Sequence, residues 1–239
     1  MSKKYYEEIV GLINKVETTQ QESIKQATEL FVENIKNDRI IHFFGTGHSH
    51  MIGIEMFVRA GGLGNINAML DDTIITSSGA EKGSAMEKID GLADIIYDQY
   101  QISSDDIMVI VSNSGRNAVP VQMAMRAKKE GLKVIAITSM EHSKSIESRD
   151  KSGKKLYEFA DVIIDNCAPK GDALIEVGEV KTGSASTILG CFIVNSILTN
   201  TVEELHRKNI KTPVFVSQNT DNFNNDHLYA KYKKVIKHM

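Results

Sequence analysis

The chain has 239 residues, of which 41% are hydrophobic and 25% are charged, as is typical of a folded globular protein. Its formal net charge of −3 does not indicate a nucleic-acid partner, and its two cysteines lack the spacing of a zinc site or a disulfide framework. We find no signal peptide and no apolar run that could span a membrane, so we expect a cytoplasmic protein that contacts neither membrane nor nucleic acid.

The first predicted element is helical and spans about Tyr5 to Lys36. Its apolar residues recur at helical spacing and no proline interrupts them. We interpret this segment as one long helix or two helices in line, forming an N-terminal helical arm (residues 1–36) ahead of a domain of residues 37–239. Because so long an apolar stripe needs a surface to pack against, we expect a homodimer or homotetramer.

Five short apolar runs then alternate with helical patterns. The runs are almost continuously apolar, as strands buried on both faces must be: Ile40–Phe44, Ile66–Leu70, Ile107–Val111, Val134–Thr138 and Val162–Asp165. The predicted helices are Ser49–Ala60, Ala85–Tyr100, Ala118–Glu130, about Thr182–Lys208 and a basic C-terminal helix, whereas Met140–Lys155 is interpreted as a loop. This alternation predicts an α/β fold with a five-stranded, doubly wound parallel sheet.

The loop after the first strand is a candidate binding loop, because ligands of open α/β sheets bind beyond the carboxyl ends of the strands. It reads Gly45-Thr46-Gly47-His48-Ser49-His50, and its two glycines allow backbone N–H groups to approach an anion. His50 replaces the third glycine of a dinucleotide fingerprint, which weakens but does not exclude a nucleotide site with Asp71 or Asp72 on the ribose. An ordinary strand–helix turn with a capping serine is the other interpretation.

The loop after the third strand has the clearest pattern. Ser112-Asn113-Ser114-Gly115-Arg116-Asn117 presents hydroxyl and amide groups at the start of a helix, with no Walker lysine. This pattern indicates a monoester phosphate as the ligand. Hydroxyl groups also precede the last long helix, in Gly178–Ser186, which contains Thr182 and Ser184. Three such loops at one edge of a sheet favour an anion site over three unrelated helix caps.

These motifs resemble those of the sugar isomerase (SIS) domain family, over roughly residues 36–210. That family binds phosphosugars through a G-x-G-x-S loop after strand one and an S-x-S-G-x-T loop after strand three, where this chain has Asn117 instead of threonine. The resemblance implies a flavodoxin-like parallel sheet of five strands and sites completed across subunits. It also implies a substrate-binding set made up of Gly45, Thr46, Gly47, Ser49, His50, Ser112, Ser114, Gly115, Asn117, Thr182 and Ser184.

Two branches of the family are similar to this chain. A long helical region ahead of a single SIS domain resembles the sedoheptulose-7-phosphate isomerases, which favours an aldose–ketose isomerase of a sugar phosphate. The segment Glu176–Ser184 resembles, without its proline, the G-P-E-x-x-T-G-S segment of N-acetylmuramic acid 6-phosphate etherases and glucokinase regulatory proteins. A sugar-phosphate ether lyase and a non-catalytic phosphosugar sensor are therefore the alternatives. The region before the first strand is too short for a helix-turn-helix DNA-binding domain.

Isomerisation needs a base that moves a proton between C1 and C2 of the sugar. The long polar segment after the second strand offers the candidate bases Asp71, Asp72, Glu87 and Asp90, of which Glu87 is the first choice and Asp72 and Asp90 follow. Asp90 aligns with the start of the E-G-A-E stretch of the etherases, and Asp72 falls near the catalytic glutamate of the glucosamine-6-phosphate synthase isomerase domain. The position of the heptose isomerase glutamate holds Arg59, one helical turn after Glu55.

The histidines divide into two groups. His48 is a candidate for opening the sugar ring, and His48 and His50 are expected to contact a ligand rather than zinc, because no cysteine or carboxylate stands beside them. We therefore expect no metal and no cofactor. His42, inside an apolar strand, is expected to be a hydrogen-bonded core residue. Further polar contacts to the anion or the sugar hydroxyls could come from Arg116, Lys170, Lys181, Asn219 and Asn222.

Overall fold

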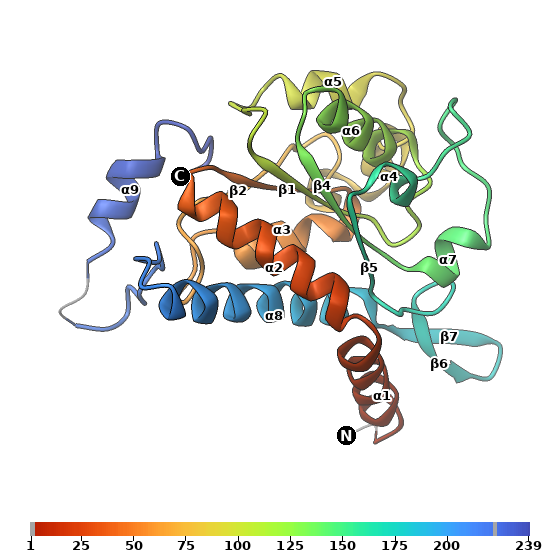
Figure 1. The fold of residues 1–239 in the computed structure, drawn as a ribbon. Coiled ribbons are helices and arrows are strands. Elements are labelled where there is room, and N and C mark those ends of the chain that lie inside the picture. The colour runs from red at the N-terminus through yellow and green to blue at the C-terminus, as the bar shows by residue number, and fades with distance from the viewer. Residues whose placement is uncertain (1–2, 222–223) are drawn as a thin grey trace.

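A five-stranded parallel sheet with helices on both faces forms the centre of the molecule, as the computed structural model of residues 3–221 and 224–239 shows (Figure 1). The strands follow the order β2-β1-β3-β4-β5, and every neighbouring pair is parallel. Their bounds are β1 Ile41–Gly45, β2 Ile66–Ala68, β3 Ile107–Val111, β4 Lys133–Thr138 and β5 Val162–Asp165. The predicted fold class, a doubly wound α/β sheet of five parallel strands, is confirmed.

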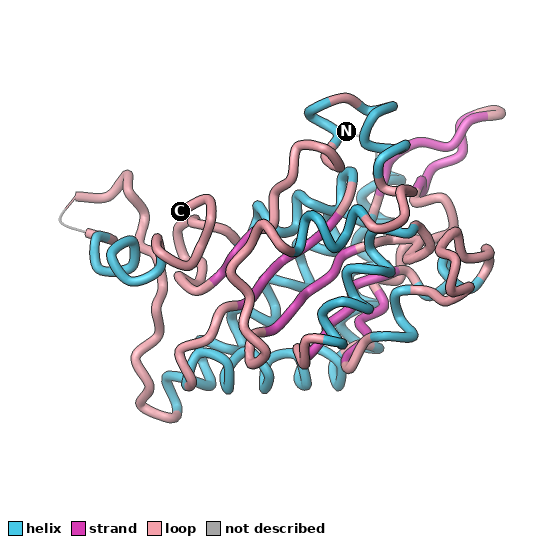
Figure 2. Tube along the Cα trace, turned by 90° about the horizontal axis from the view of Figure 1, so that it is seen from above, coloured by secondary structure: helices cyan, strands magenta, loops and turns pink. Residues whose placement is uncertain are grey.

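Each face of the sheet has its own apolar core, because successive strand residues point to opposite faces. One face packs against α2 (Gln21–Lys36), α3 (His50–Met56) and α8 (Ser186–Arg207). The other packs against α5 (Leu92–Tyr97) and α6 (Ala118–Lys129). Figure 2 shows the strands enclosed between these helices. Burial on both faces explains why the strand sequences are almost continuously apolar.

The strand order gives the sheet a topological switch point at the carboxyl ends of β1 and β3. After β1 the chain crosses to β2 on one side, and it returns to add β3 on the other side of β1. The loops that follow β1 and β3 therefore lead away in opposite directions at the point where ligands of open α/β sheets bind. The fold thus places both glycine- and hydroxyl-containing loops at this switch point.

The N-terminal region consists of two helices rather than one. α1 (Lys3–Thr19) and α2 are separated at Gln20. α2 runs along α8, and its Phe31 is buried in the same core as β1. α1 adds Ile9 and Val16 to this core, and the rest of the helix projects from the body of the molecule (Figure 1). The division into an arm of residues 1–36 and a domain of residues 37–239 stays a prediction.

The segment after β2 is less helical than predicted. The single helix expected over Ala85–Tyr100 is wrong, since α4 spans Ala80–Met86 and α5 begins only at Leu92. Gly91, just before α5, has φ +81°, a left-handed conformation that breaks helical continuity. A short 3₁₀ turn, η2 (Thr76–Ser78), precedes α4, so this segment consists of several short helical turns instead of one long helix.

Two further elements differ from expectation. The predicted loop Met140–Lys155 begins with a helix, α7 (Met140–Lys144), and is followed by the 3₁₀ turn η3 (Leu156–Phe159). The helix expected from about Thr182 begins only at Ser186, because the residues before it form a β-hairpin of β6 (Ala173–Val177) and β7 (Val180–Ser184).

The β6–β7 hairpin lies beside α1 and contacts it (Figure 1). Gly178, in its turn, has φ +60°, which allows the tight reversal between the strands. The hydroxyl of Tyr5 donates to the carbonyl of Ser184 at 2.7 Å, and a Cβ on Gly183 would lie 2.8 Å from the Tyr5 ring. Since an isolated two-stranded hairpin is only marginally stable, this contact with α1 supports it.

Helix α8 is long and apolar enough, by length and composition, to cross a membrane, contrary to our expectation that no run in the chain would be. Its residues Leu189, Ile193 and Ile197 are buried in the core beside the sheet. A core helix meets the same criteria, so this feature is weak support for a membrane span. The cytoplasmic location stays a prediction.

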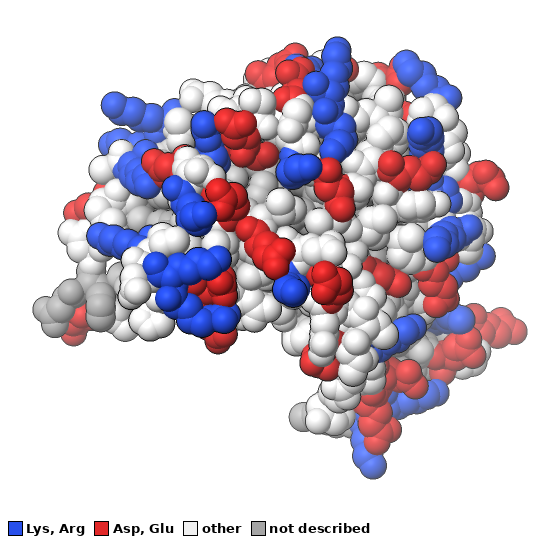
Figure 3. Space-filling view, in the orientation of Figure 1, with Lys and Arg blue, Asp and Glu red and all other residues white. Residues whose placement is uncertain are grey.

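The C-terminal residues pack beside the segment that leads into β2, where Leu63 bridges to Val214. The expected C-terminal helix is present as α9 (Asp226–Tyr232), and its Leu228 and Tyr232 pack with Ile40 and Phe215. Asn219 lies in the segment before α9, while Asn222 lies outside the described residues. On the face in Figure 3, basic and acidic side chains are interspersed over the surface.

Candidate functional site

The loop after β1 turns tightly because two of its residues are glycine. A Cβ on Gly45 would lie 2.6 Å from the carbonyl carbon of Ser49, so only glycine fits there. Gly47 has φ +55°, and its N–H donates to the carbonyl of Ile74 at 2.9 Å. The backbone of this loop is therefore tied to the segment after β2, and the N–H of Gly47 is already occupied.

The side chains of this loop differ in exposure. Thr46 is buried, with 6% of its surface exposed, whereas Ser49 is half-buried and His48 is exposed. The Nδ1 of His50 is hydrogen-bonded to the carbonyl of Gly47 within the same turn, which includes the 3₁₀ element η1 (Gly47–Ser49). Among the described residues, the side chains of His48 and Ser49 have no hydrogen-bond partner, so both can contact a ligand.

The loop after β3 leads into α6 and is fixed by its own polar groups. The N–H of Gly115 donates to the hydroxyl of Ser112 at 3.1 Å, which bends the loop back on itself. Gly115 has φ +56°, and a Cβ there would lie 3.2 Å from that of Leu156. The half-buried hydroxyl of Ser114 makes no hydrogen bond to the rest of the described chain. Ser114 is therefore the hydroxyl of this loop that is available to an anion.

Glu87 connects the two loops. Its Oε2 accepts a hydrogen bond of 2.8 Å from the hydroxyl of Thr46, and its Oε1 accepts one of 2.7 Å from the side-chain amide of Asn117. Its backbone carbonyl accepts from the N–H of Val119 at 3.1 Å, in the first turn of α6. Glu87 follows the end of α4 rather than starting a helix. The structure thus brings together three of the predicted residues, which lie far apart in the sequence.

Asp72 and Asp90 lie in different surroundings. Asp72 is exposed, and no hydrogen bond ties its side chain to the other described residues. Asp90 accepts from Lys151 at 2.8 Å and from Gln122. The hydrogen bond from Lys151, followed by that from Gln122, lowers the pKa of Asp90 below its usual range. Of Glu87, Asp72 and Asp90, only Glu87 contacts both the β1 loop and the β3 loop.

Thr182 and Ser184 are exposed residues of β7 and not of a helix start. The N-terminus of α8 is instead capped by Asp172, whose Oδ1 accepts from the N–H of Ser186 at 2.7 Å and whose Oδ2 accepts from its hydroxyl at 2.8 Å. A carboxylate of the chain therefore occupies the position at which we expected a bound anion. The predicted roles of Thr182 and Ser184 in substrate binding stay predictions.

Positive charge gathers beside the β3 loop. Arg116 belongs to that loop, and His142 lies on α7. Burial, followed by the positive charges of Lys170 and Arg116, lowers the pKa of His142. The Nε of Arg116 and the Nδ1 of His142 are both buried without a hydrogen-bond partner within the described chain. Lys181 is instead paired with Glu176 on the hairpin, at 2.7 Å.

A segment after β4 covers the β3 loop; we call residues 145–155 the β4 strap. The buried Lys155 closes the strap on itself by donating to two carbonyls, those of Ser143 and Ile146. The next residue, Leu156, donates its N–H to the carbonyl of Gly115 at 3.0 Å. In the middle of the strap, the N–H of Arg149 donates to the carbonyl of Arg116 at 2.8 Å. These bonds fix the strap against the candidate phosphate loop.

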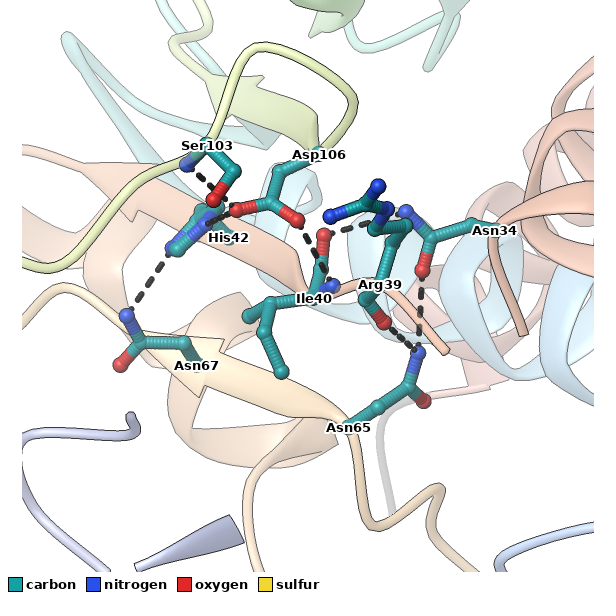
Figure 4. Close-up of polar contacts among 8 residues, drawn as sticks. All are labelled: Asn34, Arg39, Ile40, His42, Asn65, Asn67, Ser103 and Asp106. Carbon is teal, nitrogen blue, oxygen red and sulfur yellow. Dashed lines mark hydrogen bonds and ion pairs between the residues drawn. The ribbon is translucent and has the colours of Figure 1, made fainter. Parts of the chain in front are cut away.

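His42 is a hydrogen-bonded core residue, as predicted (Figure 4). It is fully buried, its Nε2 lies 3.1 Å from Oδ2 of Asp106, and its Nδ1 accepts from Asn67 at 2.9 Å. Burial raises the pKa of Asp106, but hydrogen bonds from His42 and from the N–H groups of Ser103 and Ile40 outweigh it, and the pKa lies below the usual range. This network joins the amino ends of the strands, at the opposite edge of the sheet from the β1 and β3 loops.

Within the residues that the structure describes, no group of three or more histidine, cysteine or acidic side chains is arranged to hold a metal ion. His48 is exposed and the Nδ1 of His50 is occupied by a carbonyl, so these two do not form a paired ligand set. The expectation of no metal and no cofactor stays a prediction.

Sequence reasoning did not identify Arg149, Gln122 or Asp172. Gln122 donates to Asp150 of the strap at 2.6 Å and accepts from the N–H of Gly91 at 2.8 Å. All three act through contacts between residues that lie well apart in the sequence. No local motif encodes such contacts.

Comparison with known proteins identifies the family of this chain. A family model described as "SIS domain" matches residues 4–139. The UPF0309 protein BH3325 of Halalkalibacterium halodurans is 40% identical over 227 residues, covering 93% of this chain and 94% of that protein. The UPF0309 protein TTE0306 of Caldanaerobacter subterraneus is 40% identical over 242 residues, covering 98% of each. The chain therefore belongs to the SIS domain family, and it matches these UPF0309 proteins over almost their full length.

Solved structures show the same fold. A phosphoheptose isomerase from Francisella tularensis superposes with a TM-score of 0.53 at 16% identity, covering 83% of this chain and 95% of that one. The phosphoheptose isomerase GmhA from Neisseria gonorrhoeae superposes with a TM-score of 0.52 at 18% identity, covering 82% of this chain and 95% of that one. At these identities the likeness shows the fold alone.

Proposed function

We propose that this chain binds a sugar monophosphate at the carboxyl ends of β1 and β3 and interconverts its aldose and ketose forms. The observation that carries the proposal is the position of Glu87, whose carboxylate is held between Thr46 and Asn117. This carboxylate lies at the start of α6, the same helix that follows the hydroxyl-rich loop with Ser114. A candidate base and a candidate phosphate site thus share one helix start.

The phosphate would be bound by the β3 loop. The free hydroxyl of Ser114 and the N-terminus of α6 can donate to its oxygens, and Arg116 and Lys170 supply positive charge nearby. The carbon chain of the sugar would then extend from the phosphate towards the segment after β2. In this arrangement His48, exposed in the β1 loop, is available to assist ring opening.

Glu87 would act as the general base. Each of its carboxylate oxygens accepts one hydrogen bond from the protein, so each keeps a lone pair for a proton from carbon. Removal of the proton from C2 of the aldose gives an enediolate. Return of that proton to C1, together with transfer of the O2 hydroxyl proton to O1, gives the ketose. The two donors, Thr46 and Asn117, would hold the carboxylate in one orientation during the transfer.

The resemblance to isomerases supports the reaction, and a second resemblance supports a non-catalytic alternative. The two phosphoheptose isomerases share the fold, and so does the NanR protein of Vibrio vulnificus, whose structure contains ManNAc-6P, at a TM-score of 0.52 and 16% identity. A phosphosugar sensor is therefore the second candidate. We also propose a homodimer or homotetramer, in line with the projecting α1.

The test combines binding and chemistry. A thermal-shift screen against a panel of aldose and ketose phosphates identifies the ligand, because a ligand specific for the native state raises the melting temperature by mass action. NMR of that ligand in D₂O with catalytic amounts of protein then detects isomerisation and deuterium incorporation at C1 or C2. Binding without deuterium incorporation would favour the sensor. Failure of every sugar phosphate to raise the melting temperature would contradict the proposal itself.

A further inference from the structure

Arg149 reaches the candidate site from the β4 strap. Its Nη1 donates to Oδ1 of Asn117 at 3.2 Å, and the Nδ2 of the same amide donates to Oε1 of Glu87 at 2.7 Å. Asn117 therefore lies between a guanidinium group and a carboxylate. A chain of contacts runs from the strap after β4, through the loop after β3, to the acid after β2.

The charges at its two ends fix the orientation of this amide. A guanidinium group can only donate hydrogen bonds and a carboxylate can only accept them. Only one of the two orientations of the Asn117 amide satisfies both partners, namely the carbonyl towards Arg149 and the NH₂ group towards Glu87. In the reversed orientation the amide oxygen would face the carboxylate and the NH₂ group would face the guanidinium, so both contacts would be repulsive.

The backbone of the strap limits the conformational entropy that Arg149 loses in making this contact. Its own N–H is bonded to the carbonyl of Arg116, immediately before Asn117 in the sequence. The following residue, Asp150, is buried and accepts from Gln122 of α6 at 2.6 Å. The Cα of Arg149 is thus held against the start of α6, and only the side-chain torsions remain to be ordered.

We infer that Arg149 is a positioning residue, which orients the Asn117 amide so that its NH₂ group holds the carboxylate of Glu87 in place. The inference rests on the proposed function in assigning Glu87 as the base, but the geometric part can be tested without a substrate. Arg149 does not contact Glu87 itself. Its loss should therefore change the orientation of the base more than the affinity for the phosphate.

The first measurement follows the amide directly. In ¹⁵N-labelled protein, the side-chain NH₂ signals of Asn117 are identified by their absence from the Asn117→Asp variant. We expect Arg149→Leu to shift these signals and to speed their exchange with water at least about fivefold, because the amide can now rotate away from Glu87. Arg149→Lys retains a cation that can only donate, so it should restore signals close to those of the wild type.

The matched control is Lys154→Leu. Lys154 is an exposed cation of the same strap, and its contact is with the ring of Phe159 instead of the site. This variant should leave the Asn117 signals unchanged. Unchanged signals and exchange in Arg149→Leu would overturn the inference, whether or not a substrate has been found. Equal disturbance by Lys154→Leu would also overturn it, since the effect would then come from the strap as a whole.

The second measurement uses the sugar phosphate found by the thermal-shift screen. We expect kcat to fall about tenfold in Arg149→Leu while KM changes less than about twofold, and Arg149→Lys to recover most of the turnover. A rise in KM at constant kcat would assign Arg149 to phosphate binding and reject the positioning role. If no sugar phosphate binds or reacts, the proposed function fails, while the amide measurement still decides the geometry.

Discussion

The side-chain amide of Asn117 lies 2.7 Å from the carboxylate of Glu87, across a sequence separation of 30 residues. The N–H of Val119 also donates to the carbonyl of Glu87, so both the side chain and the backbone of this acid are bound at the start of α6. An acid at that point complements the helix dipole, and it faces the loops after β1 and β3. The assignment of Glu87 as the base depends on this relationship.

The first prediction concerns the chemistry of Glu87. Glu87→Gln keeps the shape of the side chain and removes the proton acceptor, so turnover should fall roughly 10²–10⁴-fold while the sugar phosphate still binds. The measurement is the rate of aldose–ketose conversion by NMR, together with calorimetric affinity. Asp72→Asn and Asp90→Asn are the matched comparisons, and both should retain most of the activity. Full turnover in Glu87→Gln would reject this residue as the base.

The second prediction concerns the phosphate. Ser114→Ala removes the free hydroxyl of the β3 loop and should weaken binding of the sugar phosphate by about 1–3 kcal/mol, because a charge-assisted hydrogen bond is lost. Isothermal titration calorimetry measures the change. Ser145→Ala is a suitable control, since the hydroxyl of Ser145 donates to the carbonyl of His142 in the adjacent turn. Equal affinity of wild type and Ser114→Ala would place the phosphate elsewhere.

The third prediction concerns the turn after β1. The Cβ of Gly45→Ala would lie 2.6 Å from the backbone of Ser49, and backbone atoms cannot move aside as a flexible side chain can. We expect this variant to lower the free energy of unfolding by about 3 kcal/mol, which is the upper end of the destabilisation that overpacking substitutions usually cause. Gly11→Ala in α1 has no atom within 4 Å of the new Cβ and should be neutral or slightly stabilising. Urea denaturation of both variants provides the comparison.

The fold was predictable because its determinants are local. Buried parallel strands such as Ile107–Val111 are apolar throughout, and the predicted range matches the observed one. The helix ends were less predictable, because the left-handed backbone of Gly91 interrupts the predicted helix just before α5 and the hairpin before α8 packs against Tyr5. Helical periodicity cannot reveal either effect.

The candidate site was only partly predictable. Thr46, Glu87 and Asn117 were identified separately, from strand-end position or family resemblance, and the structure brings them together. Arg149 was not identified, because its contact with Asn117 depends on how the β4 strap folds over another loop. A side chain that acts across loops leaves no spacing pattern in the sequence.

The fourth prediction concerns oligomerisation. The projecting α1 and the β6–β7 hairpin leave Tyr6, Val177 and Val180 exposed at 57% or more of their surface. Burying these apolar side chains against a second copy would remove them from water, so we expect light scattering at micromolar concentration to report a dimer or tetramer. A single species with the mass of one chain would contradict this prediction.

The last prediction concerns pH and the buried network at the other end of the sheet. Asp106 is 4% exposed and accepts hydrogen bonds from the N–H groups of Ile40 and Ser103 at 2.9 and 2.8 Å. Its folded-state pKa lies below the value of an unfolded aspartate, so the folded protein binds the proton less readily than the unfolded chain. The charge of Asp106 therefore stabilises the fold fully when the pH is above the pKa of this residue in the unfolded chain. The stabilisation is lost as the pH falls through its pKa in the folded protein.

Asp106→Asn should expose this dependence. At pH 7 the variant lacks the charge-assisted hydrogen bonds, and we expect its free energy of unfolding to be lower by about 1.5–3 kcal/mol. As the pH falls below about 4, the wild-type carboxyl becomes protonated and resembles the amide, so the difference between the two proteins should shrink. Asp105→Asn is the neighbouring control, because Asp105 forms an exposed pair with Arg39 and its replacement should cost less than about 1 kcal/mol. Chemical denaturation at a series of pH values measures both, and a difference between wild type and Asp106→Asn that stays constant from pH 7 to pH 3 would contradict the assigned role of the charge.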